Sequence, residues 1–326
     1  MKRSAPQLVS VAAIVIGLTL FIVTLFYIDL DETIASASRL GLALPVILLP
    51  GTCWHLLRTW GWSIAFPDAE RPPFTRLFRV RLAADAIGFF TVRGIANEPL
   101  KVLLLYDRVK PEVTTAAVAL ERLAFAVVGT AIAALISAFA VTRLSMPAAW
   151  EGVFTSLVIG AVILLTLAGL LARRRSGDYL GRLVTRLDEV TGRRLEASRV
   201  VRFILDVEDV LLELLRGDRQ RLVALTGLAT ICYVLMAFEI WLVFWAINEP
   251  IGVMEGLAVE TFARLASVAS AAIPGNIGAL EASNAAVVAA LGLGGGGSLA
   301  LTRRVRALLW AAAGLAMYPR VQERRQ

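Results

Sequence analysis

Two short stretches of the chain combine helix-breaking residues with groups that can bind an ion or a polar headgroup. The first, TVRGIANEPLK at 91–101, has Gly94 and Pro99 among charged and amide side chains. The second is PGNIGALE at 274–281. Guanidinium and carboxylate groups beside a broken helix can pair with a phosphate, with a cation or with each other. The candidate binding residues of the two stretches are Arg93, Asn97, Glu98, Lys101, Pro274, Gly275, Asn276, Gly278 and Glu281.

Further charged residues stand in the apolar segments around these stretches. Arg81 and Asp85 precede the first stretch, and Glu239 is a lone carboxylate that could pair with an arginine further along. Arg81 and Asp85 are four residues apart, and so are Glu260 and Arg264. Within each of these pairs the two charges can simply neutralise each other on one helix face. Three arginines near the start of the last helix can also reach the interface with their side chains. The flanking segments add the candidate residues Glu121, Arg122, Glu260, Arg264, Arg303, Arg304 and Arg306.

The elements that carry these residues are apolar helices. The chain is 58% apolar and 18% charged, with a mean hydropathy of +0.72, whereas soluble domains have about 25% charged residues. Runs of about 18 or more residues without charge are long enough to cross a bilayer. Such uncharged runs cover 4–28, 123–142, 152–172 and 282–302. The sequence therefore predicts an all-α polytopic membrane protein, with residues 1–326 as one domain.

The distribution of Lys and Arg predicts how the helices are oriented. Six full transmembrane helices are expected at about 8–28, 42–66, 112–142, 152–172, 222–247 and 298–318. Basic residues concentrate in the connections 67–81 and 173–221, and cytoplasmic connections carry such an excess. We therefore expect a multi-pass protein of the cytoplasmic membrane with both termini in the cytoplasm. The connection 173–221 also predicts an amphipathic cytoplasmic helical insert.

Two more apolar stretches, 74–109 and 254–291, break in the middle, and each must return to the side from which it starts. Together with their neighbours they give the order span, hairpin, span twice, at about 42–142 and about 222–318, beginning from opposite sides. This order predicts an inverted-topology repeat whose broken segments meet at a binding site near the bilayer midplane. We expect two opposed re-entrant hairpins, although two full crossings each would give the same orientation.

Other kinds of chemistry find less support in the sequence. The net charge is +7, but the basic residues lie beside helix ends, where membrane orientation explains them better than nucleic acid does. Cys53, Cys232 and the single histidine, His55, form no pattern typical of structural zinc. The run 294–297 lacks the Lys-Ser/Thr end of a phosphate-binding loop, and we interpret it as a flexible connector. No cofactor or metal is expected.

At its charged breaks the chain resembles the flippase-like integral membrane family, which includes the N-terminal flippase domain of bifunctional lysylphosphatidylglycerol synthases and hopanoid-biosynthesis-associated membrane proteins. The resemblance rests on GIANEPLKVLLL (94–105), ALERLAF (119–125), AIPGNIGALEASNAAVVAALGL (272–293) and TRRVRALLW (302–310). Where family members often have a glycine pair before the first glutamate, this chain has Ala96 and Asn97. The resemblance implies handling of an amphiphilic lipid by Glu98, Arg122, Pro274, Gly275, Gly278, Glu281 and Arg304.

The leading hypothesis is an integral membrane lipid flippase or lipid transporter, not an enzyme, which moves a phospho- or isoprenoid lipid through a polar midplane cleft. One alternative is a membrane-embedded transferase in which Glu98 or Glu281 acts as a general base on a lipid-linked substrate. The other is an accessory scaffold whose segment 176–217 recruits a lipid-biosynthesis enzyme. The expected partner is a membrane lipid. A lipid-biosynthesis enzyme and a second copy of the chain, forming a homodimer, are further candidates.

Overall fold

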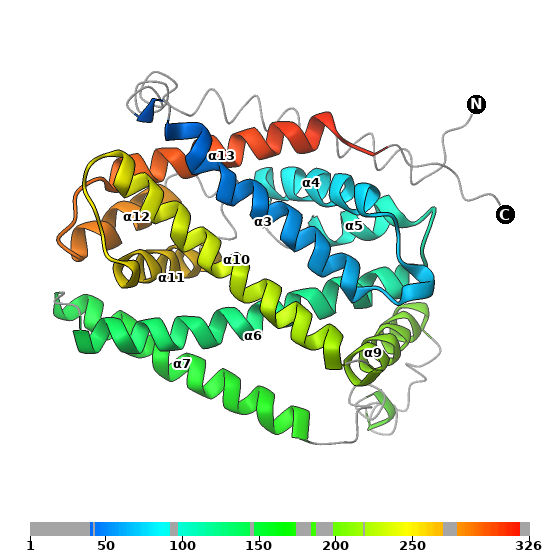
Figure 1. Cartoon of the computed structure of the whole chain (residues 1–326). Helices are drawn as coiled ribbons and strands as arrows, with labels where there is room; N and C mark the ends of the chain where they lie inside the picture. Colours follow the sequence, from blue (N-terminus) through cyan, green and yellow to red (C-terminus); the bar gives the residue numbers. More distant parts are fainter. Residues whose placement is uncertain are drawn as a thin grey trace.

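Every regular element in the described part of the protein is a helix, as predicted (Figure 1). The computed structural model describes residues 40–41, 43–91, 97–143, 147–173, 184–186, 198–217, 219–269 and 279–319. The helices are α3 (Ala43–Ala65), the 3-10 helix η1 (Asp68–Glu70), α4 (Phe74–Phe90), α5 (Asn97–Leu105), α6 (Pro111–Arg143), α7 (Ala148–Arg173), α9 (Arg199–Gly217), α10 (Arg219–Ala246), α11 (Val253–Ala269), α12 (Ala279–Ala290) and α13 (Gly296–Ala316). The predicted first span, 8–28, lies outside the described residues.

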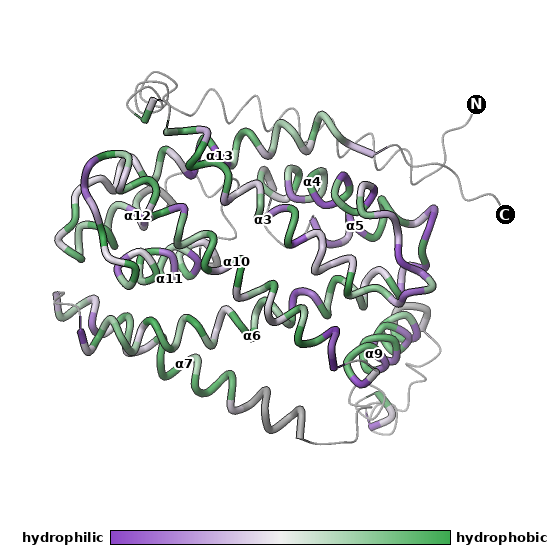
Figure 2. Tube along the Cα trace, viewed as in Figure 1, coloured by the Kyte–Doolittle hydropathy of each residue, from purple (hydrophilic) through white to green (hydrophobic). Residues whose placement is uncertain are grey.

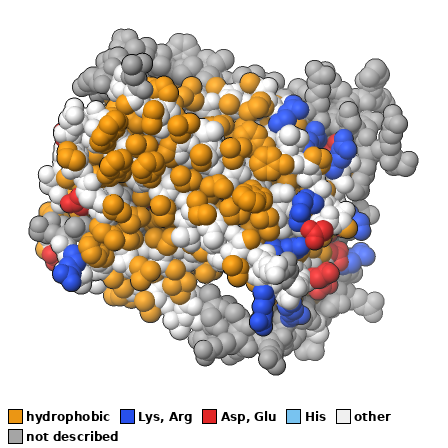
Figure 3. All heavy atoms as spheres, in the orientation of Figure 1, with side chains coloured by type: hydrophobic (Ala, Val, Ile, Leu, Met, Phe, Trp, Pro, Cys, Tyr) orange, Lys and Arg blue, Asp and Glu red, His pale blue; other side chains and the backbone are white. Residues whose placement is uncertain are grey.

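Three of the described helices are long and apolar enough to cross a membrane: Pro111–Arg143, Ala148–Thr166 and Arg219–Ala246. The apolar windows of α6 and α7 are only 11% buried, whereas that of α10 is 61% buried. Hydrophobic side chains cover the face of the molecule seen in Figure 3, and Lys and Arg gather at the end where α9 lies. Along the chain trace, hydrophilic residues are frequent at the same end (Figure 2). The molecule therefore has the lipid-facing surface of a multi-pass membrane protein, with α10 near its centre.

Prolines mark where several of the helices begin. Pro73 immediately precedes α4, Pro111 is the first residue of α6, and Pro99 lies in the first turn of α5. The first turn of a helix tolerates proline because its backbone N–H groups have no intrahelical partner there. The two arms of the first predicted hairpin, 74–109, are therefore α4 and α5, with 92–96 between them outside the described residues.

The helices pack in two sets with matching neighbours. In the first set α3 packs on α4, α4 on α5, and α5 on α6; in the second, α10 packs on α11, α11 on α12, and α12 on α13. Between the sets, α3 packs on α10, α4 on α13, and α11 on α6. The α4–α5 pair lies toward one end of the molecule, and the α11–α12 pair lies toward the other (Figure 1).

Small residues allow the closest helix contacts. A Cβ atom added at Gly314 of α13 would overlap the backbone oxygen of Leu82 in α4 and lie 2.9 Å from the Cβ of Ala86. A Cβ atom added at Gly88 of α4 would lie 2.6 Å from the Cβ of Asn97 in α5. Protein interiors leave little free space, so these glycines fix how near α4 can come to its two neighbours.

The helix α9, within the predicted insert 173–221, is amphipathic in the structure. Its side chains Val207, Val210, Leu211 and Leu215 pack against a core formed by α3, α4, α5 and α6, and Leu214 is buried within that core. Its charged residues Arg202, Asp209 and Glu213 are exposed. The rest of the insert lies largely outside the described residues.

Candidate functional site

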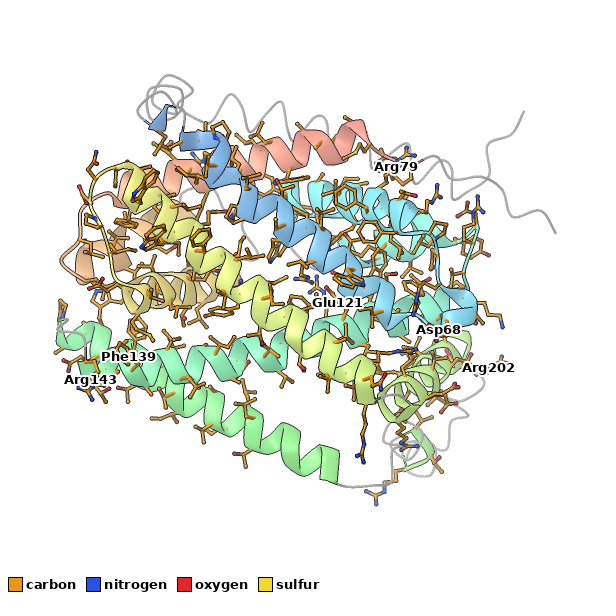
Figure 4. The ribbon with its side chains drawn as sticks, in the orientation of Figure 1. Asp68, Arg79, Glu121, Phe139, Arg143 and Arg202 are labelled. Carbon is orange, nitrogen blue, oxygen red and sulfur yellow. The ribbon has the colours of Figure 1, made fainter. Side chains whose placement is uncertain are left out.

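A first charged cluster is centred on Glu121 of α6, which is 1% exposed. Arg58 of α3 donates two hydrogen bonds to its carboxylate, from Nε (2.6 Å) and Nη2 (2.9 Å), and Arg81 of α4 donates a third (3.3 Å). Arg81 also donates to the backbone oxygen of Arg58 (3.0 Å). Figure 4 places Glu121 in the interior of the helix bundle. One carboxylate thus ties α6 to two other helices.

The same cluster continues toward the surface through the start of α5. The Nζ atom of Lys101 lies 3.2 Å from both carboxylate oxygens of Glu98 and 4.0 Å from Asp85. Asn97 donates a hydrogen bond to Asp85 (3.3 Å). Arg122 donates to Glu98 and, at 3.4 Å, to the side-chain oxygen of Asn97. The side chain of Arg122 is 48% exposed, so this arginine is the accessible cation of the cluster.

A second cluster is centred on Glu260 of α11, which is 3% exposed. It accepts a hydrogen bond from Arg264 on the same helix (2.6 Å) and another from Arg303 of α13. Arg303 also donates to the side-chain oxygen of Asn284 in α12 (3.0 Å). Arg303 thus connects both arms of the second helix pair, α11 and α12, to α13.

The second cluster also extends to α10. Arg306 of α13 donates to Glu239 of α10, which is fully buried. The guanidinium of Arg264 lies over the ring of Tyr233, 4.3 Å from its centroid, and the Tyr233 hydroxyl is 2.6 Å from that of Thr261. The side chain of Arg264 is 35% exposed, which makes it the more accessible partner of Glu260.

The two clusters have the same layout with the charges exchanged. In the first, an arginine of the first helix (Arg58) pairs with a glutamate of the last helix (Glu121). In the second, the first helix carries the glutamate (Glu239) and the last helix the arginine (Arg306). Removing one partner of a buried ion pair is costly because the other is left uncompensated, so these pairs fix the packing of each set.

Several predicted site residues come together in these clusters. Asn97, Glu98, Lys101, Glu121 and Arg122 meet in the first. The second brings together Glu260, Arg264, Arg303 and Arg306, although Arg306 pairs with Glu239 and not with Glu260. Arg304 lies partly buried beside them on α13. The predicted residues Arg93, Pro274, Gly275, Asn276 and Gly278 lie outside the described residues, and Glu281 lies in α12 with its side chain outside that description.

One sequence-based interpretation is incomplete, and one residue is missing from the predicted set. The pairs 81/85 and 260/264 do form along their helices, but Arg81 and Glu260 each also bind a second helix, so self-neutralisation does not account for them. Arg58 was not predicted, although an arginine inside the apolar stretch 42–66 was a signal for it. Within the described residues no three His, Cys, Asp or Glu side chains are grouped to hold a metal ion.

Comparison with known families gives one match. The family model for the lysylphosphatidylglycerol synthase TM region matches residues 11–316. Neither a curated protein nor a solved structure matches the chain.

Proposed function

Because the chain belongs to the lysylphosphatidylglycerol synthase TM region family, we propose that it is a lipid flippase or lipid transporter of the cytoplasmic membrane and not an enzyme. The observation that carries the proposal is the pair of charged clusters within the apolar helices. Ionisable groups inside a membrane are costly and commonly mark a substrate path. Each cluster has a fully buried carboxylate paired with arginine and one more exposed arginine, Arg122 or Arg264.

We propose that the two helix sets, α3–α6 and α10–α13, are inverted-topology repeats with opposed re-entrant hairpins. Their matching helix contacts support this. So do the hairpin lengths: α4 and α11 have 17 residues each, and α5 and α12 have 9 and 12. At 1.5 Å per residue, α5 and α12 are about 14 and 18 Å long. A bilayer core is about 30 Å thick, so the described part of each of these two arms is shorter than the core.

The accessible arginines are the proposed headgroup contacts. Glu98 holds Arg122, and Glu260 holds Arg264. A lipid phosphate offers an arginine the same kind of charge-assisted hydrogen bond that a carboxylate does. A headgroup can therefore take the place of the hairpin carboxylate, while the buried pairs, such as that of Arg58 with Glu121, continue to hold the helices together. The lipid tails would stay in the surrounding bilayer.

The proposed direction of the path follows from the ends of the molecule. The Lys- and Arg-rich end would face the cytoplasm, and it is the end toward which α4 and α5 lie (Figures 1 and 3). The first cluster would then receive a headgroup from the cytoplasmic side, and the second from the outside. Tilting of one helix set against the other would pass the headgroup between them, as in other transporters built from inverted repeats.

The test is lipid movement in liposomes reconstituted with the purified protein. Fluorescent phosphatidylglycerol and phosphatidylcholine would be followed in wild type, Arg122→Gln and Arg264→Gln. Arg143→Gln, at the exposed far end of α6 (Figure 4), is the matched control. A hydrogen bond to a charged group contributes about 1.5–3 kcal/mol, so we expect a roughly 10- to 100-fold loss of transport in the first two variants and none in the control.

Two outcomes would overturn the proposal. Equal lipid movement in protein-free and protein-containing liposomes for every lipid class would exclude transport of these lipids. A chemically altered lipid, detected by mass spectrometry of the same vesicles, would instead support the transferase alternative.

A further inference from the structure

The single histidine of the chain, His55, lies between the two charged clusters. It is on α3, one turn before Arg58 of the first cluster and one turn after Gly51. A Cβ atom added at Gly51 would lie 2.8 Å from Cδ of Arg306 and 3.7 Å from a carboxylate oxygen of Glu239. One face of α3 therefore runs from the second cluster, past His55, to the first.

The imidazole of His55 is enclosed but not fully satisfied. The residue is 8% exposed, and its ring lies 4.3 Å from that of Trp310 and 4.9 Å from that of Trp54, measured between centroids. Its Nδ1 atom has no hydrogen-bond partner among the described residues, and the same holds for Oε1 of the buried Glu239. Buried polar atoms are nearly always paired, and each exception calls for an explanation.

The charges around His55 leave an excess of positive charge within the described part of the chain. The groups that act on it, or that pair with those groups, are Arg58 on α3, Arg81 and Asp85 on α4, Lys101 on α5, Glu121 on α6, Glu239 on α10 and Arg306 on α13. Four cations therefore face three carboxylates. A proton on the imidazole would add to this excess of positive charge, so it needs an added negative charge nearby.

An anion bound at Arg122 can supply that charge through a chain of contacts. Arg122 holds Glu98, and Glu98 shares Lys101 with Asp85. If an anion takes Arg122, Glu98 is left with Lys101 as its partner. Lys101 then compensates Asp85 less, and the negative charge of Asp85 favours a proton on His55. The added negative charge thus reaches the imidazole without direct contact.

We infer that His55 is a proton-binding site coupled to the binding of an anionic lipid headgroup at Arg122, so that one proton and one lipid anion bind together. This inference rests on the proposed function, because the headgroup must reach Arg122. Coupling between two ligands is reciprocal. The lipid anion therefore strengthens proton binding by the same factor by which the proton strengthens lipid binding.

The experiment follows the imidazole directly. Because the chain has one histidine, the full-length protein without a polyhistidine tag, labelled with ¹⁵N-histidine, gives a single imidazole signal by NMR. It would be titrated with acid in nanodiscs of phosphatidylcholine alone and of phosphatidylcholine with phosphatidylglycerol. We expect phosphatidylglycerol to move the midpoint of protonation upward by at least about one pH unit, a tenfold gain in proton affinity.

The variant Arg122→Gln separates the site from the general potential of an anionic bilayer. The effect of phosphatidylglycerol is expected to fall to the small shift that surface charge alone produces. The inference is wrong if wild type titrates alike in both nanodiscs, or if the shift persists in Arg122→Gln. If liposomes at matched pH show lipid transport but the shift is absent, the coupling alone is disproved. If the shift is present but transport is absent, the proposed transport is disproved and the coupled binding stands.

Discussion

At the scale of single residues, the carboxylate of Glu121 compensates two guanidiniums at once, that of the half-buried Arg58 and that of the buried Arg81. Arg58 and Arg81 come from different helices, and both donate hydrogen bonds to this group. Arg81 is 2% exposed, so water cannot replace the lost partner. These hydrogen bonds therefore fix α3, α4 and α6 in one arrangement. That arrangement holds the partly exposed Arg122 beside the start of α5.

We predict that Glu121→Gln destabilises the protein by about 3–5 kcal/mol, the usual cost of breaking a buried ion pair from one side. The neutral amide still fits the space, so the loss of stability measures the effect of the missing charge and not of a change in side-chain volume. Thermal unfolding of the purified protein in detergent measures it. Glu213→Gln, on the exposed face of α9, is the control and should change stability by less than about 0.5 kcal/mol. Equal stability of both variants would contradict the role given to Glu121.

The clusters also show how far single residues can be predicted from sequence. Glu98 stands beside a helix break, which marks it from the sequence, whereas its partner Arg122 lies further along the chain inside α6. The expected arginine partner of the lone Glu239 is confirmed as Arg306. Arg58 escaped prediction because its partner lies 63 residues away. No local pattern states which distant carboxylate a buried arginine will meet, since packing decides it.

At the scale of helices, the contact of α4 with α13 joins the two sets, and it depends on Gly314. The backbone oxygen of Leu82 occupies the place where any side chain at 314 would begin. Backbone atoms cannot move aside as a flexible side chain can. The two helices would therefore have to separate if residue 314 were larger.

We predict that Gly314→Ala destabilises the protein by about 1–3 kcal/mol, the range for overpacking a close contact. It should also lower lipid transport, because α13 carries Arg303 and Arg306. Gly129→Ala is the matched control, since a Cβ atom there meets nothing within 4 Å and alanine favours a helix. Heating both purified variants in detergent compares them, and an unchanged unfolding temperature for Gly314→Ala would disprove the close contact.

Helix positions were more predictable than the connections between them. The helices predicted at 222–247 and 298–318 correspond to α10 and α13 within a few residues, because apolar runs set their limits, and of these two α10 is also long and apolar enough to span a membrane. The glycine run 294–297 was interpreted as a flexible connector, but two of its residues have specific roles. Gly295 has a left-handed φ of 74°, and Gly294 lies against the carboxylate of Glu249. Glu249 lies well before this run in the sequence, so the run itself does not indicate the contact with its carboxylate.

At the scale of the whole molecule, charge and apolar surface are segregated in a way that should fix its orientation. The hydrophobic face separates a basic end, which includes Asp68, Arg79 and Arg202, from the end that includes Arg143 (Figures 3 and 4). Lys and Arg are retained on the cytoplasmic side during insertion, whereas acidic residues contribute little. The residues at the first end should therefore face the cytoplasm, and the loop between α10 and α11 should face outward.

Single cysteines at the two ends test this orientation. In a background with Cys53→Ala and Cys232→Ala, Ala69→Cys would report the basic end and Val253→Cys the opposite end, since both positions are exposed. We predict that a membrane-impermeant maleimide labels Val253→Cys in intact cells and Ala69→Cys only after permeabilisation. The reverse pattern would place the first cluster, with Arg122, toward the outside. It would also reverse the proposed path, because the headgroup that reaches Arg122 would then come from the outer leaflet.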